Sequence, residues 1–318
     1  MSFAPSSLLP SFSRSASRVA IVRSADYGRD LDNLLFEALR EFDLPIAGKK
    51  VLLKPNFVDL DPAGAVNTHP AVVRAAREAF LRLGARSVRV GEGPAHERDT
   101  EAIIEAFRLR DFLPSRSDLF VDLNLDEVQP IKLRTRASQL KQLYLPRTVL
   151  EADYLVSLPK LKTHRWVGVT LSLKNMLGIV PGCCYGWPKN ALHWAGIIPS
   201  VLDINSTVRP DFAIVDGIVG MEGNGPLQGS PKASGVLILG DDPVAVDATG
   251  ARVMGLVPER IEYLAKAGSL LGNVQTEKIR QLGERVESVK IPFAVPPAFQ
   301  HCVAAEGPRG QFEAGQAC

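Results

Sequence analysis

Short apolar runs alternate along this chain with stretches whose apolar residues recur at helical spacing, and this alternation constrains the fold more than any other feature. Residues 50–53 form an apolar run that predicts a strand, and the amphipathic stretch that follows opens at His69-Pro70 and closes at Gly84. Proline suits the first turn of a helix, and glycine suits the position just beyond its end. Residues 87–90 are again short and apolar. This order predicts a βαβ unit with parallel strands.

The same alternation continues in the second half of the chain. Residues 153–158, 212–215 and 235–239 read as buried strands. Asp242 followed by Pro243 is typical of the start of a helix. The predicted fold class is therefore α/β, with a largely parallel sheet flanked by helices in three layers.

The length of 318 residues allows one large domain or two modest ones. We expect a single α/β domain over residues 18–290, in which the less regular residues 108–150 form a candidate inserted lid. The Ser-rich residues 1–17 lack the uninterrupted apolar stretch of a secretory signal, so they read as a disordered tail, with a transit peptide as the alternative. Residues 291–318 are rich in Pro, Gly and Ala and read as a loose C-terminal arm.

Composition excludes several classes of partner. The 37 basic and 35 acidic residues give a net charge of +2, which predicts binding to neither nucleic acid nor an anionic membrane surface. No run approaches the roughly 20 apolar residues of a membrane span, so a cytoplasmic location is expected. The 4 cysteines form no CxxC pattern, so neither a disulfide framework nor an iron–sulfur cluster is expected.

Polar segments follow the predicted strands at four places, namely residues 54–56, 91–94, 159–164 and 216–226. Together they contain lysine, glutamate, aspartate and histidine side chains. Ligands of open α/β sheets bind outside the carboxyl ends of the strands. The sequence therefore predicts one shared ligand site at this edge.

Three basic residues alternate in one of these segments. In an extended chain Lys160, Lys162 and His164 point to the same side, where a carboxylate or phosphate would relieve their mutual repulsion. The alternative is a set of solvated side chains on a surface loop. The residues expected to bind the anion or a phosphorylated cofactor are Lys54, Asn56, Lys160, Lys162, Thr163 and Asn175.

Acid–base chemistry is expected from Lys174, His164 and Glu92. Residues 170–175 alternate polar and apolar side chains in a way that fits either a strand or a short helix. Desolvation near the other lysines would lower the pKa of Lys174 toward the range of a useful base, whereas the competing interpretation is an exposed lysine. The oxygen and nitrogen ligands of a divalent metal would be Asp216, Glu222 and His193.

Two further features leave alternatives open. Residues 181–194 contain two Trp, one Tyr, two Cys and His193 among Gly and Pro, which indicates either a flap over a pocket or a plug on the core. Asp247 lies within an apolar helical stretch, where a carboxylate belongs to a site or has a partner.

Several segments, taken in order, resemble the domain-of-unknown-function 362 family over about residues 50–255. They are VLLKPNF from Val51, HPAVV from His69, VGEGP from Val90, LPKLKTH from Leu158, LKNMLG from Leu173 and VDG from Val215. Many members of that family carry a ferredoxin-like cluster segment, whose cysteine pattern this chain lacks. In outline, the first half is also similar to the lactate racemase family, which uses Lys and His around a nickel-pincer nucleotide. No residue is carried over from that second family.

These observations support two functional hypotheses. The first is an enzyme that acts on a small anionic metabolite or cofactor with Lys and His acid–base groups and a divalent metal, for example as a metal-assisted isomerase, a racemase-like enzyme or a transferase. The alternative is a non-catalytic binding or redox-partner protein without an iron–sulfur segment, with residues 181–194 as its contact surface.

Overall fold

The computed structural model describes residues 16–28, 30–61, 63–95, 99–113 and 119–305. Its strands are β1 (Ser17–Arg23), β2 (Lys50–Pro55), β3 (Ser87–Glu92), β4 (Phe120–Asp122), β5 (Val128–Lys132), β6 (Gln142–Pro146), β7 (Tyr154–Leu158), β8 (Lys160–His164), β9 (Gly168–Thr170), β10 (Phe212–Asn224), β11 (Gln228–Gly240) and β12 (Ile279–Gly283).

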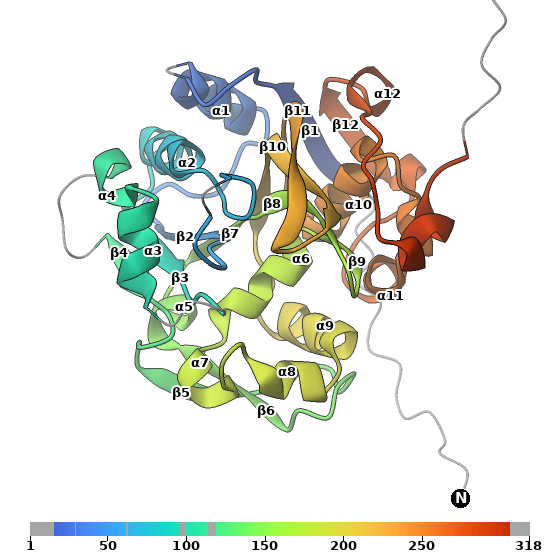
Figure 1. Ribbon diagram of the computed structural model, residues 1–318. Helices are drawn as coiled ribbons and strands as arrows, with labels where there is room; N and C mark the ends of the chain where they lie inside the picture. The colour runs from blue at the N-terminus through green and yellow to red at the C-terminus, as the bar shows by residue number, and fades with distance from the viewer. Residues whose placement is uncertain (1–15, 29, 62, 96–98, 114–118, 306–318) are drawn as a thin grey trace, which may run out of the picture.

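The α-helices surround these strands (Figure 1). They are α1 (Leu31–Arg40), α2 (Pro70–Arg82), α3 (Thr100–Ala106), α4 (Leu109–Phe112), α5 (Arg147–Leu150), α6 (Ser172–Asn175), α7 (Gly182–Tyr185), α8 (Asn190–Trp194), α9 (Ile197–Thr207), α10 (Pro243–Val253), α11 (Glu262–Leu270) and α12 (Val286–Val289). Shorter 3-10 turns are η1 (Met176–Ile179), η2 (Pro258–Arg260), η3 (Thr276–Lys278) and η4 (Pro297–Cys302). Within the described ranges, no helix has both the length and the apolar composition needed to cross a bilayer.

The central sheet has the strand order β12-β1-β11-β10-β7-β2-β3-β4, with β8 added beside β10 and β9 beside β8. The pairs β4–β3, β3–β2, β2–β7, β7–β10, β10–β8 and β1–β12 are parallel. The pairs β1–β11, β11–β10 and β8–β9 are antiparallel. The predicted largely parallel sheet is confirmed, and its parallel part brings the carboxyl ends of β2, β3 and β8 to one edge.

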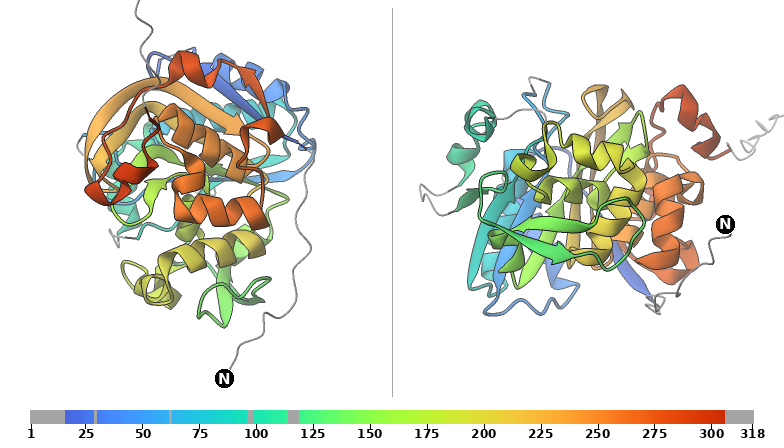
Figure 2. Two further views of the ribbon diagram at one scale, coloured as in Figure 1. Left: turned by 90° about the vertical axis from the view of Figure 1, so that its right-hand side faces the viewer. Right: turned by 90° about the horizontal axis from the view of Figure 1, so that it is seen from below.

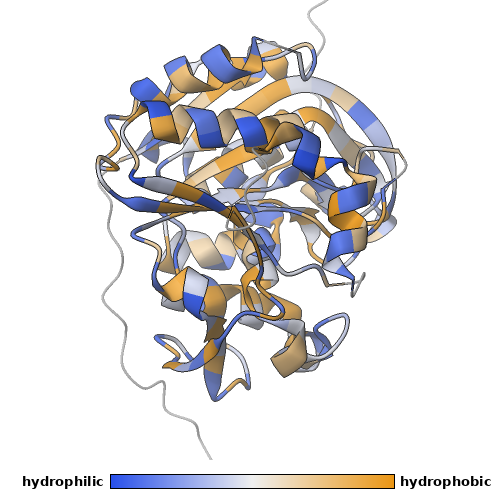
Figure 3. Ribbon diagram, turned by 90° about the vertical axis from the view of Figure 1, so that its left-hand side faces the viewer, coloured by the Kyte–Doolittle hydropathy of each residue, from blue (hydrophilic) through white to orange (hydrophobic). Residues whose placement is uncertain are grey.

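Helices cover both faces of the sheet. Val51 and Leu53 of β2 pack into a core with residues of α1 and α2, whereas Leu52 packs into the core on the other face with residues of α9, α10 and α11. Figure 2 shows α10 and α11 (orange) on the face opposite α1 and α2 (blue). In Figure 3 the helices alternate hydrophilic and hydrophobic residues along their length, as amphipathic helices do. The predicted three layers are confirmed.

The predicted helix starts are confirmed by their capping contacts. The His69 ring accepts a hydrogen bond from the backbone N–H of Ala71 at the start of α2. The Asp242 carboxylate does the same for Val244 at the start of α10. Gly84 follows α2 with a φ of +96°, a conformation that costs glycine little.

The hairpin of β10 and β11 differs from the sequence prediction. Residues 216–226 were expected to be a loop after a strand, but β10 continues to Asn224 and β11 begins at Gln228. A Cβ at Gly220 would lie 2.7 Å from the carbonyl oxygen of Leu161, so glycine allows β8 to approach β10 closely. Asp216 and Glu222 therefore lie along a strand rather than beyond its end.

Residues 108–150 contribute to the body of the fold where the structure describes them. Strand β4 extends the central sheet beside β3, and β5 and β6 pair as a separate two-stranded sheet. Figure 2 shows β5 and β6 (green) on the outside of the molecule. Leu143 and Leu145 of β6 are buried in the core shared with α9 and α10. The described part of this segment thus contains a packed hairpin, and the inserted lid stays a prediction.

The chain ends also differ from the predicted boundaries. Strand β1 already begins at Ser17, whose hydroxyl donates a hydrogen bond to Asp242. Residues 291–305 are not loose: the backbone N–H of Phe293 donates to the carbonyl of Met254, and the side chains of Phe293 and Cys302 are buried. The Phe293 ring lies beside Gly220 of β10, and the Phe299 ring lies beside Gly168 of β9. Phe293 belongs to the main apolar core and Phe299 packs against it, which explains the order of this segment. The predicted tails at residues 1–15 and 306–318 lie outside the described residues.

Candidate functional site

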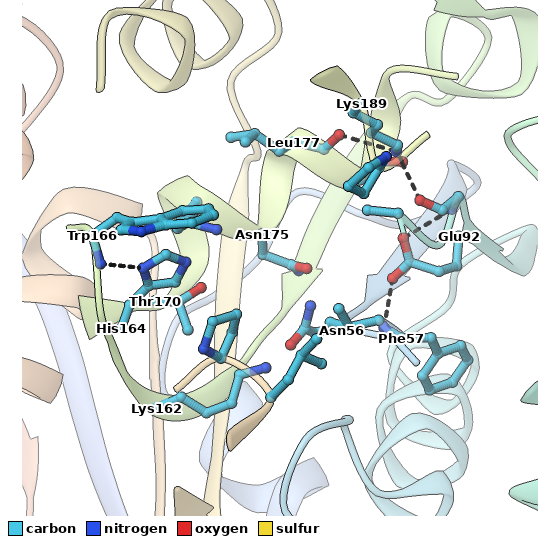
Figure 4. Close-up of a pocket in the computed structure, with 18 of the residues that line it drawn as sticks. Asn56, Phe57, Glu92, Lys162, His164, Trp166, Thr170, Asn175, Leu177 and Lys189 are labelled. Atoms are coloured by element: carbon cyan, nitrogen blue, oxygen red, sulfur yellow. Dashed lines mark hydrogen bonds between the residues drawn. The ribbon is translucent and has the colours of Figure 1, made fainter. Parts of the chain in front are cut away.

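A cavity of about 280 Å³ opens at the edge where β2, β3 and β8 end. Lys54 comes from the end of β2, Glu92 from the end of β3, Lys162 and His164 from β8, and Lys174 from α6. Figure 4 shows Lys162, His164, Thr170, Asn56 and Asn175 around one space, with Glu92 and Lys189 on its far side. The remaining lining residues include Phe57, Val58, Gly93, Ala95, Arg165, Trp166, Leu177, Gly178, Pro188, Asn190, His193, Pro226 and Leu227.

The cavity brings together most of the residues that the sequence nominated. Lys54, Asn56, Glu92, Lys162, His164, Lys174, Asn175 and His193 line it. Lys160, Thr163, Asp216 and Glu222 do not. The hydroxyl of Thr163 faces the β10 backbone instead and donates to the carbonyl of Gly223 at 2.8 Å.

Lys54 and Glu92 form a buried ion pair with an Nζ–Oε2 distance of 2.8 Å. The other donors of Lys54 bond to the carbonyl of Pro55 and to Oδ1 of Asn175. Glu92 also accepts from the backbone N–H groups of Phe57 and Gly93. Burial lowers the pKa of Lys54, and the nearby Glu92 carboxylate opposes that shift. Because every donor of Lys54 and both Glu92 oxygens are occupied, this pair builds the cavity wall.

Lys160 belongs to a second buried cluster. Its Nζ lies 2.9 Å from Oδ2 of Asp216 and 2.9 Å from the hydroxyl of Tyr27. Tyr27 donates to the other Asp216 oxygen and stacks on His69, with ring centroids 3.8 Å apart. The backbone N–H of His69 also donates to Asp216. Asp216 thus has strong partners within the protein, and Lys160 is neutralised there.

Lys162 and Lys174 lack such a carboxylate among the described residues. The Lys162 side chain is 1% exposed, and its Nζ donates to the carbonyl of Val66 at 2.7 Å. Burial, and then the charges of Lys174 and Lys160, hold the pKa of Lys162 well below its usual range. Lys174 is partly exposed to the cavity and makes no hydrogen bond or ion pair with a described residue. Burial and the charge of Lys54 lower the pKa of Lys174 to about 8.

His164 lines the cavity as a neutral ring. Burial, followed by the charges of Lys174 and Lys162, strongly lowers the pKa of its imidazole. Its Nδ1 atom accepts a hydrogen bond from the backbone N–H of Trp166 at 3.1 Å. A neutral imidazole that accepts at one nitrogen carries its proton on the other. His164 therefore offers its Nε2–H as a hydrogen-bond donor, and its lone pair is already used.

Asp247 determines where Lys174 lies. Its two carboxylate oxygens accept from the backbone N–H groups of Ser172 (2.7 Å) and Leu173 (3.0 Å), at the start of α6. The sequence alternatives for residues 170–175 are thereby settled, since β9 ends at Thr170 and α6 begins at Ser172. Asp247 does not line the cavity. It acts as a buried cap that positions the helix carrying Lys174.

The segment 181–194 is both a plug and a wall of the cavity. Tyr185 and Leu192 are buried in the core, whereas Pro188, Lys189 and His193 line the cavity. The Nζ of Lys189 donates to the carbonyls of Gly93 (2.7 Å), Leu177 and Gly178, and burial lowers its pKa to about 7.

Sequence reasoning did not select Lys189, Thr170 or Trp166 as site residues. The only signal for Lys189 was its place in an aromatic Gly/Pro segment, and nothing in that pattern indicates a lysine that turns inward. Thr170 was visible as part of an alternating stretch, and Trp166 as an aromatic residue close to His164.

The three predicted metal ligands lie apart. His193 is at the cavity, Asp216 is in the Lys160 cluster, and Glu222 pairs with Lys232 at 3.0 Å and accepts from the backbone of Ala294. Among the described residues, no group of three or more His, Cys, Asp or Glu side chains could hold a metal ion. The β10 strand explains the separation, because Asp216 and Glu222 are six residues apart along it.

Comparisons with known proteins give a family and a set of relatives. A family model described as "Domain of unknown function (DUF362)" matches residues 51–252. A thylakoid-associated protein of Synechocystis is 30% identical over 224 residues, which are 69% of this chain and 67% of that protein. The cytoplasmic location expected from the sequence stays a prediction.

Two solved structures are similar at a lower level. One is a protein of Thermotoga maritima, with 13% identity, a TM-score of 0.38, and 60% of this chain and 50% of that chain covered. The other is the lactate racemase apoprotein of Thermoanaerobacterium thermosaccharolyticum, with 14% identity, a TM-score of 0.40, and 66% and 51% covered. The chain spans about half the length of both proteins. By the match over residues 51–252, and by its similarity to the Synechocystis protein, this chain belongs to the DUF362 family of domains of unknown function.

Proposed function

We propose that this protein is an enzyme that binds a small anionic metabolite, a carboxylate or a phosphate, in the cavity and exchanges protons with it through Lys174. The observation that carries the proposal is the pair Lys162 and Lys174, two lysines that line one cavity without a carboxylate partner among the described residues. A cavity of about 280 Å³ suits a small metabolite.

The electrostatics favour an anion at this place. Burying an ammonium group is costly unless an opposite charge accompanies it, and a second ammonium nearby adds to the cost. Within the protein that cost appears as the lowered pKa of Lys162 and of Lys174. A bound carboxylate or phosphate would supply the missing charge and accept charge-assisted hydrogen bonds.

The surrounding groups have separate roles in this proposal. Lys162 binds the anionic group. The side chains of Asn56 and Thr170, which make no hydrogen bond with a described residue, offer further hydrogen bonds. His164 donates from Nε2 to an oxygen of the metabolite. Lys174, with a pKa of about 8, takes up and releases protons close to neutral pH, where a general base is most effective.

The test is calorimetric titration of the protein with inorganic phosphate and with malonate. We expect Lys162→Met to weaken binding at least tenfold, because a charge-assisted hydrogen bond contributes about 1.5–3 kcal/mol. The control is Lys266→Met, since Lys266 pairs with Glu262 on an exposed helix face away from the cavity. Unchanged affinity in Lys162→Met would reject the proposal and favour a non-catalytic binding protein that uses the 181–194 segment.

The affinity should also depend on pH in a stated direction. The anion prefers the protonated amines, whereas burial and neighbouring cations lower the pKa of Lys174 to about 8 and hold that of Lys162 well below its usual range. Affinity should therefore fall as pH rises above about 8, by up to tenfold per pH unit for one proton taken up on binding. Titrations in buffers of different ionisation enthalpy measure this proton uptake directly. Binding that is independent of pH between about 8 and 10 would contradict the role of Lys174.

A further inference from the structure

Lys174 differs from every other lysine of the cavity in having an amine with no partner in the described structure. Lys54 is held by Glu92, Lys189 by three backbone carbonyls, and Lys162 by the carbonyl of Val66. Lys174 is also partly exposed to the cavity, whereas those three are buried at 2% exposure or less. An amine that carries out covalent chemistry must be reachable by the substrate and must keep its lone pair available.

We propose that Lys174 is a nucleophile that forms an imine with the carbonyl carbon of a 2-oxo acid whose carboxylate is bound by Lys162. This inference rests on the proposed function and names the substrate class for the same cavity. A 2-oxo acid has a carbonyl next to its carboxylate, so one such molecule can contact both lysines at once.

The position of Lys174 is rigid where a covalent catalyst needs rigidity. The first residues of α6 are held by Asp247, and the last residue, Asn175, donates to the carbonyl of Lys54 and to Ser157. The helix is therefore fixed at both ends while the Lys174 side chain extends into the cavity. Residues that are held by packing and hydrogen bonds position a reactive group at low entropic cost.

The electrostatic surroundings keep part of the amine neutral. With a pKa of about 8, roughly a tenth of Lys174 is deprotonated at pH 7, compared with fewer than one in a thousand of ordinary lysines. Desolvation and a neighbouring cation are recognised ways to activate a lysine for imine formation. The Nε2–H of His164 is the donor available to the carbonyl oxygen of the substrate.

The cavity wall beyond the basic groups is largely apolar. Phe57, Leu177, Pro226 and Leu227 line it, and the Trp166 ring, which is 54% exposed, lies at its border. A 2-oxo acid with an apolar side chain would therefore place its carboxylate at Lys162 and its side chain against these residues.

The step balances without an oxidant or reductant. The neutral amine of Lys174 adds to the carbonyl carbon, a C–N bond forms, and the proton lost from nitrogen goes to the former carbonyl oxygen. A second proton, donated by solvent water, then joins that oxygen, and the hydroxide ion that this leaves stays in the solvent. The C–O bond breaks, water leaves, and a protonated imine remains.

The experiment is reductive trapping of the full-length protein with borohydride in the presence of pyruvate or phenylpyruvate. Peptide mass spectrometry should find one reduced adduct, located on residue 174. Lys174→Arg should lose the adduct but still bind propionate, which has the carboxylate without the carbonyl. Lys266→Met should give the wild-type yield of adduct.

Each outcome decides a separate point. Propionate binding without any adduct on wild-type Lys174 would overturn the imine and leave the proposed anion site intact. Adducts spread over exposed lysines at equal yield would overturn it as well. Failure of phosphate, malonate, propionate and pyruvate all to bind would reject the proposed function, and the imine with it. Because the adduct is located on the wild-type chain, the result does not depend on the folding of a variant.

Discussion

Lys160 and Lys162 lie two residues apart on β8, point to the same side and are both buried, yet their surroundings are opposite. The Nζ of Lys160 lies 2.9 Å from Oδ2 of Asp216 and 2.9 Å from the hydroxyl of Tyr27. The Nζ of Lys162 donates to a single acceptor, the backbone carbonyl of Val66. The neighbouring strand explains this difference. In the register of β8 and β10, Asp216 stands opposite Lys160, and Met221 stands opposite Lys162.

The comparison shows how one strand can carry two buried lysines, one paired with a carboxylate and one bonded to a backbone carbonyl. A carboxylate on the adjacent strand completes the first within the protein. The thioether of Met221 supplies no negative charge to the second, so burial and the neighbouring cations hold the pKa of Lys162 well below its usual range. The residue type is the same in both cases, and the partner strand decides the role.

The largest effect that would test this contrast is on the Lys160 side. Lys160→Met removes one member of a buried ion pair and leaves Asp216 without its cation, so we expect a loss of about 3–5 kcal/mol in the free energy of unfolding. Urea denaturation followed by circular dichroism measures it. A loss below about 1 kcal/mol would show that Tyr27 and the backbone of His69 suffice for Asp216.

Asp247 provides the next test, because it is a buried carboxylate paired with backbone groups instead of a lysine. Burial raises the pKa of Asp247 to about 8, which the N–H groups of Leu173 and Ser172 partly oppose. The folded protein then holds a proton that the unfolded chain releases near pH 4, so the contribution of Asp247 to stability is lost as pH rises from about 4 to 8.

Asp247→Asn should remove this dependence. Denaturation at several pH values measures the unfolding free energies of wild type and variant. As the pH rises from about 4 to 8, the wild type should lose stability relative to the variant. A difference that stays constant from pH 4 to 8 would mean that Asp247 is ionised in the folded protein throughout this range.

A smaller effect is expected from Tyr27→Phe. The change removes the hydroxyl that donates to Asp216 and accepts from Lys160, while the ring can still stack on His69. The ion pair itself remains, but the Asp216 carboxylate and the backbone N–H of Val219 each lose a hydrogen bond. We therefore expect about 1.5–3 kcal/mol of destabilisation, the usual contribution of a hydrogen bond to a charged group. Thermal unfolding measures the change, and a loss as large as that of Lys160→Met would make Tyr27 the key member of the cluster.

The smallest effect on stability is expected from Lys162→Met, the counterpart of the first variant. Removing a buried amine that has no carboxylate leaves no orphaned charge, so the free energy of unfolding should change by less than about 1 kcal/mol. The same variant should bind phosphate and malonate at least tenfold more weakly. If Lys162→Met is destabilised as strongly as Lys160→Met, the contrast between the two lysines fails.

Much of the fold could be predicted because it depends on local pattern. The helix starts at His69-Pro70 and Asp242-Pro243 follow from the capping preferences of these residues, and the alternating apolar runs predicted the three layers. The convergence of Lys54, Glu92 and Lys162 followed from their positions near the carboxyl ends of parallel strands.

The predictions from the sequence were wrong where segments that are far apart in the sequence meet in the structure. The segment after residue 215 was expected to be a loop because it is rich in glycine, yet those glycines allow β8 and β10 to pair. The Lys189 side chain turns into the cavity because the backbone carbonyls of Gly93, just after β3, and of Leu177 in η1 accept its donors, and no local pattern shows that contact. Residues 291–305 are ordered by core packing and by backbone hydrogen bonds to Val253 and Met254, which their own composition does not show.

The sequence by itself determined the α/β class, the order of the elements and the collection of basic residues at one edge of the sheet, because these depend on periodicity and on the direction of parallel strands. Only the tertiary structure decided which of these lysines pair with a carboxylate and which do not, among the residues that it describes. The reason is that a buried charge responds to groups within a few ångströms, and at Lys160 and Lys162 those groups come from the register of a strand more than fifty residues away in sequence.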